Sequence, residues 1–184
     1  MFGLMQMIRA GTVFALGVFL AASLCATTLE QLSMDEMIQK SSAVVRARVT
    51  GSYSASRSGG IFTFYRLQII EEWKSSNQPL TEVAVPGGTV RGVRQTVAGA
   101  PQMTTGQEYV LFIWISRAGL PQVIGLSQGL FIVGQDASGE TVVRRPAATE
   151  RMLDQSGQPV DDHALGVRLV DLRSLVRGTA GGAK

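Results

Sequence analysis

One histidine stands in this sequence, directly after two carboxylates. Asp161, Asp162 and His163 have the residue types of a general base and an orienting acid, as in triad chemistry. The three residues fall in a polar segment just before an apolar stripe of helical spacing, where a carboxylate typically caps a helix or joins a solvated cluster. We therefore assign no catalytic residue here and keep a hydrolase only as an alternative function.

The chain has few of the cysteine and histidine side chains that bind metals. A single cysteine and a single histidine exclude cysteine-based zinc clusters and multi-histidine sites. Glu71 and Glu72 are neighbours in a predicted strand, so their side chains point to opposite faces and do not flank one bond. The segment 136–140 (DASGE) lacks the alternating acids of an EF-hand loop and is typical of a hairpin turn. We predict no metal and no cofactor.

The segment 86–101 (PGGTVRGVRQTVAGAP) is the most unusual stretch of the chain, with four glycines and only two charges. It lacks the GxxxxGK[ST] pattern and lysine of a phosphate-binding loop, so its glycines favour tight turns with positive φ. Glycine-rich arms beside a compact domain often carry the binding surface. We predict partner contact by this segment together with one tryptophan, through Pro86, Gly87, Gly88, Arg91, Arg94, Gly99 and Trp73.

Trp73 is expected at or near the core, where aromatic side chains usually pack. An alternative places it with Tyr53, Arg46 and Arg48 on one open barrel face, because such faces bind oligonucleotides or sugars in OB-type barrels. Nucleic acid is not expected as a partner, because the basic residues are spread along the chain rather than concentrated and the chain looks exported.

A folded domain must position these residues, and the composition permits one. The chain has 184 residues, of which 45% are hydrophobic and 17% charged, with a formal net charge of +3. This composition excludes a disordered chain, and the length predicts one domain plus extras.

The first 26 residues are typical of an export signal. Arg9 precedes a charge-free apolar run at 10–24, which is short for a spanning helix. Cleavage fits after Ala26 or after Cys25. Lipidation of Cys25 and an uncleaved leader are alternatives, and they are the only membrane contacts expected. We predict a secreted or periplasmic protein with one β-rich domain at 27–177 and a flexible tail at 178–184.

Hydrophobic periodicity predicts a helix, about seven strands and a second helix. The first helix lies within 29–40 and begins near Ser33, because Ser33 and Glu36 fit a capping box. The last lies at 165–176, where apolar residues recur at spacings of four, three and four. A loose hairpin is expected at 89–100 and loops at 51–60 and 147–163. Strands are predicted at 43–50, 61–74, 80–85, 108–116, 122–126, 130–135 and 141–145, with 108–116 central and covered on both faces.

Consecutive strands without helices between them exclude parallel βαβ units and favour an antiparallel meander or a small barrel. A barrel closed by a terminal helix would also protect the sheet edges. We therefore predict a mainly β fold, an OB-like small antiparallel barrel with an N-terminal helix and a C-terminal amphipathic helix.

Several short motifs resemble a group of uncharacterised exported bacterial proteins. The shared pattern is a PGG segment at 86–88, a GAP segment at 99–101, GQEYVLF at 106–112 and QGLF at 128–131. That group has no established activity to carry over. The strand rhythm and the GxxYVLF turn are also similar to netrin-like and metalloproteinase-inhibitor modules, which are OB-type barrels. Those inhibitors use an N-terminal cysteine and disulfides, which the expected mature chain lacks, so this resemblance implies the barrel rather than the mechanism.

These observations predict an exported, non-enzymatic binding or interaction module for an unknown protein or cell-envelope ligand. A protease-inhibitor-like module and a cell-envelope hydrolase or accessory enzyme are the alternatives.

Overall fold

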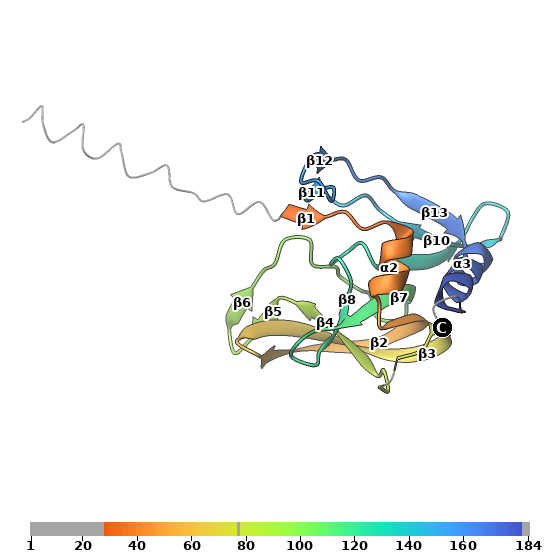
Figure 1. The fold of residues 1–184 in the computed structure, drawn as a ribbon. Helices are drawn as coiled ribbons and strands as arrows, with labels where there is room; N and C mark the ends of the chain where they lie inside the picture. Colours follow the sequence, from red (N-terminus) through yellow and green to blue (C-terminus); the bar gives the residue numbers. More distant parts are fainter. Residues whose placement is uncertain (1–27, 77, 182–184) are drawn as a thin grey trace, which may run out of the picture.

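The computed structural model describes residues 28–76 and 78–181, and this part is mainly β with two helices (Figure 1). A short helix, α2 (Met34–Lys40), comes early and a longer one, α3 (Leu169–Gly181), comes last. The prediction of a mainly β chain with an N-terminal and a C-terminal helix is therefore confirmed. The predicted leader, residues 1–26 with Cys25, and residues 182–184 of the predicted tail lie outside the described residues.

One large sheet organises the fold, in the order β13-β10-β9-β7-β2-β3-β4-β8, and β8 also pairs with β7. Most neighbours are antiparallel, but β8 runs parallel to β4 through the Ala84–Gln122 pair. The strands of this sheet are β2 (Ala43–Arg57), β3 (Gly60–Lys74), β4 (Glu82–Pro86), β7 (Glu108–Ile115), β8 (Pro121–Val123), β9 (Leu130–Gln135), β10 (Thr141–Arg145) and β13 (Leu165–Arg168). Two small sheets accompany it, formed by β1 (Thr28–Glu30), β11 (Arg151–Leu153) and β12 (Pro159–Val160), and by β5 (Gly88–Val90) and β6 (Val93–Gln95).

The longest hairpin, β2–β3, corrects the prediction of a loop at 51–60. Residues 51–57 continue β2 and pair with β3 down to Arg57 opposite Gly60. The serine- and glycine-rich composition suggested a loop, but the aromatic and β-branched partner strand stabilises the pairing, since strand propensity depends on context. Ser58 and Gly59 make the reversal with φ of 50° and 82°, as a two-residue type I′ hairpin turn requires.

Two hydrophobic clusters lie on opposite faces of β7. Val110 and Phe112 join one cluster with α2 and α3, whereas Tyr109, Leu111 and Ile113 join a second cluster with β2, β3 and β4. Alternate side chains of a strand point to opposite faces, so an apolar run without alternation means burial on both. The prediction that 108–116 is central and covered on both faces is confirmed.

The first helix begins as predicted. Ser33 caps α2, its hydroxyl accepts from the Glu36 N–H, and the Glu36 carboxylate accepts from the Ser33 N–H at 3.0 Å. Residues 29 and 30, at the start of the range predicted to hold this helix, belong instead to β1, which pairs in parallel with β11. The loop predicted at 147–163 is likewise interrupted by the short strands β11 and β12.

The second helix is shifted from its predicted position. Residues 165–168 form β13 and pair with β10, and the helix runs from Leu169 to Gly181. Leu169, Leu172 and Val176 are buried in the core, as their spacing predicted, whereas Leu165 is exposed because it belongs to the strand. Residues 178–181, predicted to be part of a flexible tail, are the last turn of α3.

Candidate functional site

The arm predicted to contact partners folds back onto the end of the β2–β3 hairpin. β4 ends at Pro86, two glycines follow, and β5 and β6 then form a small hairpin near the β2–β3 turn (Figure 1). Gly87 and Gly88 have φ of +102° and +138°. A Cβ at Gly88 would lie 2.6 Å from Ser54 Oγ and 2.7 Å from Thr63 Oγ1. Glycine is therefore required here for close packing as well as for backbone conformation.

Hydrogen bonds fix the arm to the start of β3. The Gly87 N–H donates to the Ile61 carbonyl at 2.8 Å, and Thr63 Oγ1 donates to the Gly87 carbonyl at 2.9 Å. On the returning strand, Gln95 Oε1 accepts from the Ile61 N–H at 2.9 Å. These contacts reach both strands of the small hairpin, so it is held at its base.

A cavity of about 230 Å³ lies between the arm and the sheet. Four of the predicted contact residues, Pro86, Gly87, Gly88 and Arg94, line it. Arg91 is at the β5–β6 turn, and Gly99 lies farther along, where an added Cβ would be 3.1 Å from the Glu150 side chain. The structure thus brings most of the predicted residues to one end of the molecule.

Trp73 is not among the residues gathered there. It is 5% exposed, belongs to the core cluster under the helices, and donates from Nε1 to Glu71 at 3.1 Å. It lies eleven residues beyond Phe62 on β3, roughly 35 Å at the rise of an extended strand. The alternative of an open face that combines Trp73 with Tyr53 and the two arginines of β2 is wrong in one respect: Trp73 is buried and is not part of an exposed surface.

The tip of the arm exposes an apolar side chain between two cations. Arg91 and Gly92 have φ of 49° and 79° and connect Val90 to Val93 as a type I′ turn. Val93 is 63% exposed, the largest fraction among the large hydrophobic side chains described. Arg91 and Arg94 are also exposed.

The arm end of the molecule carries an excess of positive charge. Residues 51–66 and 82–107 include four arginines, at positions 57, 66, 91 and 94, and one acid, Glu82. None of these arginines forms an ion pair within the described residues. Arg66 stacks over Tyr53 at 5.4 Å, and Tyr53 donates to Glu82 at 3.0 Å. Burial and the Glu82 carboxylate raise the pKa of Tyr53.

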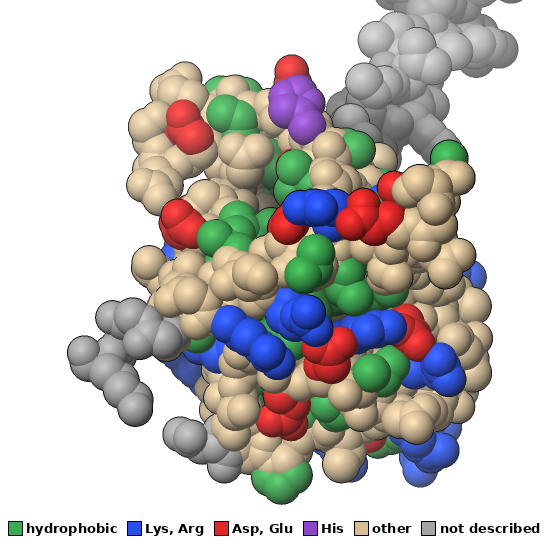
Figure 2. Space-filling model, turned by 90° about the vertical axis from the view of Figure 1, so that its right-hand side faces the viewer, with side chains coloured by type: hydrophobic (Ala, Val, Ile, Leu, Met, Phe, Trp, Pro, Cys, Tyr) green, Lys and Arg blue, Asp and Glu red, His purple; other side chains and the backbone are tan. Residues whose placement is uncertain are grey.

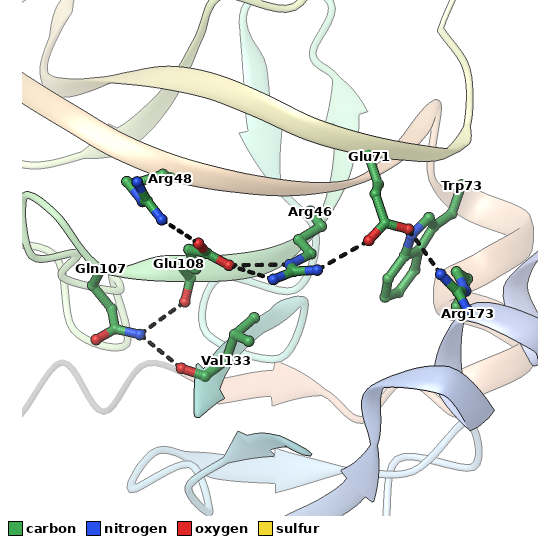
Figure 3. Close-up of polar contacts among 8 residues, drawn as sticks. All are labelled: Arg46, Arg48, Glu71, Trp73, Gln107, Glu108, Val133 and Arg173. Atoms are coloured by element: carbon green, nitrogen blue, oxygen red, sulfur yellow. Dashed lines mark hydrogen bonds and ion pairs between the residues drawn. The ribbon is translucent and has the colours of Figure 1, made fainter. Parts of the chain in front are cut away.

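The arginines at the other end of β2 are paired (Figure 3). Arg46 donates from Nε and Nη2 to Glu108, at 3.1 and 2.7 Å, and from Nη1 to Glu71 at 3.0 Å. Arg48 also contacts Glu108, and Arg173 of α3 donates to Glu71 at 3.2 Å. On the molecular face at the side of α3, acidic and basic side chains lie next to each other (Figure 2).

The two carboxylates of this network have pKa values below the ordinary value of a glutamate. Burial raises the pKa of Glu71 and Glu108, but hydrogen bonds from Trp73, Arg46 and Arg173 to Glu71 outweigh it, as do those from both β2 arginines to Glu108. Both pKa values are therefore lowered. Glu72 is exposed and contacts Ser75 instead, which agrees with the prediction that the two neighbouring glutamates point to opposite faces.

Asp162 pairs with Arg145 rather than with the side chain of the neighbouring His163. Asp162 accepts from Nη1 and Nη2 of Arg145, both at 2.8 Å, and from the Ala148 N–H at 2.8 Å. These hydrogen bonds outweigh the effect of burial and lower the pKa of Asp162. The His163 side chain is exposed and makes no hydrogen bond to either aspartate. At 136–140 the predicted hairpin turn is confirmed, because Asp136 Oδ1 accepts from the backbone of Ser138 and Glu140.

Sequence reasoning missed a GxSxG pattern at 125–129 (GLSQG), which in hydrolases marks a nucleophile between a strand and a helix. Here the segment is a turn between two strands, and the positive φ of 57° belongs to Leu126 rather than Ser127. Gln128 is buried and tethers the N-terminal segment, accepting from the Leu32 N–H and donating to the Glu30 carbonyl. The residues of this pattern therefore form a turn and hold the N-terminal segment in place.

No family model and no curated protein matches this chain. Among the described residues, no three potential metal ligands lie together. None of the helices described is long and apolar enough to span a bilayer. Function is therefore inferred from the residues themselves.

Proposed function

We propose that this chain is an exported, non-enzymatic binding module that contacts a protein or cell-envelope ligand through its 86–101 arm. The observation that carries the proposal is the contrast within the arm: its base is fixed by hydrogen bonds to Ile61 and Thr63, whereas its tip leaves Arg91, Val93 and Arg94 exposed. A preorganised element with exposed contact groups binds at low entropic cost.

The body that holds the arm is, in this proposal, an OB-like small barrel. The pairings support it: β2 pairs with β3, β3 with β4, β4 with β8, β8 with β7, and β7 with β2, which forms a ring. The Ala84–Gln122 pair is the only register position between β4 and β8 within the described residues. An Ala84→Cys, Gln122→Cys variant should form a disulfide on mild oxidation, whereas Ala84→Cys with Arg117→Cys should not. Failure of the first pair to cross-link would contradict closure.

Ligand contact is tested by capture with the expected mature chain, 27–184. Extracts of the cell envelope and of the culture medium are passed over immobilised wild-type protein and over an Arg91→Asn, Val93→Ser, Arg94→Gln variant. A partner retained by the wild type and lost by the variant supports the proposal. Equal retention by both proteins would place the contact elsewhere. An Arg117→Gln variant is the matched control, because Arg117 is also an exposed arginine in a turn between two strands.

Export is tested separately by fusing residues 1–26 to a reporter that is active only outside the cytoplasm. Activity with these residues, and its loss when Arg9 and the apolar run at 10–24 are replaced, supports export. An inactive fusion would contradict it.

Protease inhibition is a second candidate function, and one observation favours it. The arm presents Arg91 as an exposed side chain at the turn between two paired strands, and the specificity pocket of trypsin-like proteases binds an arginine side chain. The expected result is slower cleavage of a reporter substrate by co-secreted proteases. Loss of this effect in Arg91→Asn would support inhibition. Rapid cleavage of the arm by the same proteases would contradict it.

A further inference from the structure

The conformation of Arg91 is unfavourable for its residue type. The first position of a type I′ turn requires positive φ, and asparagine, aspartate or glycine normally occupies it. At the corresponding position, the type I′ turn of the β2–β3 hairpin has Ser58, which has a smaller side chain. A strained residue that retains a long charged side chain points to a use for that side chain, because strain in folded proteins concentrates at functional sites.

The register of the arm separates its side chains into two sets. Thr89 pairs with Arg94, and Val90 pairs with Val93. Neighbouring residues of a strand point to opposite faces, so Arg94 faces the cavity that it lines while Val93 faces away from it. Arg91 stands between the strands at the turn. The tip therefore offers a cation at the turn, an apolar side chain on one face and a second cation on the other.

We propose that this tip docks onto an acidic polypeptide surface, whose carboxylates pair with Arg91 at the turn and whose aliphatic side chain covers Val93, while Arg94 on the opposite face adds to the positive charge that attracts it. The inference rests on the proposed function and names the chemistry of its partner. Arginine is enriched at protein interfaces and among the residues that contribute most to their binding energy. The surplus of three positive charges in residues 51–66 and 82–107 supplies the attraction that orients an acidic partner.

The contribution of Val93 to binding distinguishes a polypeptide partner from a polyanion such as a nucleic acid or a sulfated polysaccharide. A polyanion binds through its charge density and gains little from an exposed valine. A polypeptide partner gains from covering the side chain, because burying apolar surface is favourable. Removing Val93 without changing charge is therefore the diagnostic substitution.

The test is selection from a random twelve-residue peptide library displayed on phage, with the wild-type chain as bait. Counter-selection uses the Arg91→Asn, Val93→Ser, Arg94→Gln variant. We expect the retained peptides to be enriched in aspartate or glutamate next to leucine, isoleucine or valine. The affinity of a retained peptide should fall at least tenfold in Arg91→Asn and severalfold in Val93→Ser, and it should be unchanged in Arg117→Gln. Thermal unfolding establishes that each variant is folded.

The outcomes separate this inference from the proposed function. Peptides that depend on the arm but carry no acidic enrichment overturn the acidic partner and leave the binding module standing. Two results identify a polyanion site and overturn the inference. In the first, the retained peptides bind Val93→Ser as well as they bind the wild type. In the second, heparin binding is lost in Arg91→Asn and unchanged in Val93→Ser. Selection that yields no peptide dependent on the arm overturns the inference and contradicts the arm as the contact surface.

Discussion

The arginines of this protein occupy two kinds of environment. Those that pair with carboxylates stabilise the fold, whereas those that are exposed without an ion pair among the described residues are available to bind a partner. Arg46 lies in the middle of the sheet, with Glu108 on β7 and Glu71 on β3 both within hydrogen-bond distance. Arg91 lies at the tip of a hairpin and forms no ion pair within the described residues. Replacing Arg46 should therefore weaken the fold, whereas replacing Arg91 should weaken only binding.

The sharpest form of this contrast is the buried pair of Arg145 and Asp162, whose side chains are 7% and 3% exposed. Asp162→Ala leaves a buried guanidinium without its counter-charge, so we expect the free energy of unfolding to fall by about 3–5 kcal/mol. Urea denaturation measures it. The matched control is Asp171→Ala, whose partner Arg168 is exposed and which should leave the urea midpoint almost unchanged. Equal losses in the two variants would contradict the distinction between buried and exposed pairs.

Close packing at Gly88 provides the next largest effect, this time in the arm. An alanine at position 88 would place its Cβ too close to Ser54 and Thr63, and its backbone would have to keep a positive φ. We therefore expect Gly88→Ala to destabilise the protein by about 2–4 kcal/mol. Gly92→Ala is the control, because a Cβ there meets nothing within 4 Å, and its loss should be about 1 kcal/mol. If Gly88→Ala were as stable as Gly92→Ala, the arm would not be packed on the hairpin as described.

The paired network itself predicts a smaller loss. Arg46→Gln removes three hydrogen bonds to two carboxylates, but the Arg46 side chain is 22% exposed and solvent screens part of the interaction. We expect a loss of about 1–2 kcal/mol in urea denaturation. Arg94→Gln should change stability by less than about 0.5 kcal/mol, because it is an exposed arginine without an ion pair among the described residues. A comparable loss in both variants would remove the basis of the comparison.

Lowering the pH should weaken the ion pairs of the paired region. The folded-state pKa values of Glu71, Glu108 and Asp162 lie below their ordinary values of 4.5, 4.5 and 3.8. Unfolding therefore takes up protons at low pH, so the stability that these groups contribute is fully present above about pH 5 and is lost as pH falls through the folded pKa values. Thermal unfolding from pH 7 to pH 3 should show this decline. Glu108→Gln should flatten it, and an identical slope would show that other carboxylates cause it.

The sequence predicted the elements whose signal is local. The capping box at Ser33 and Glu36, the doubly covered strand around Leu111 and the hairpin turn at Asp136 each depend on neighbouring residues, and each was found. The arm, too, was recognisable from its glycines. Residues 51–57 were misjudged because their strand character comes from pairing with Ile61–Arg66, and Leu165 because it continues the helical spacing while pairing with Arg145.

The contrast between paired and exposed arginines had no sequence signal. Arg46 is 62 residues from Glu108 and 25 from Glu71, and Arg173 is 102 residues from Glu71. No local pattern links residues at such separations, and only the sheet register brings them together. Trp73 was grouped with the arm for the same reason: its residue type suits an interface, but its register position places it beneath α3.

Arg91 itself gives the smallest effect and the one with opposite sign. An Arg91→Asn variant keeps the turn and replaces a residue that disfavours positive φ with one that tolerates it, so we expect stability to rise by about 0.5–1 kcal/mol. Differential scanning calorimetry resolves a change of this size as an increase in Tm of about 1–4 °C. Ser58→Asn, at the same position of the β2–β3 turn, is the matched control and should stabilise the protein similarly without changing peptide binding. If Arg91→Asn gains stability and loses its ligand, then Arg91 serves binding and not the stability of the fold. The arginine side chain at this position would then lower stability while it contributes to binding. A loss of stability in Arg91→Asn would instead mean that Arg91 supports the arm, and the comparison between the two regions would no longer hold.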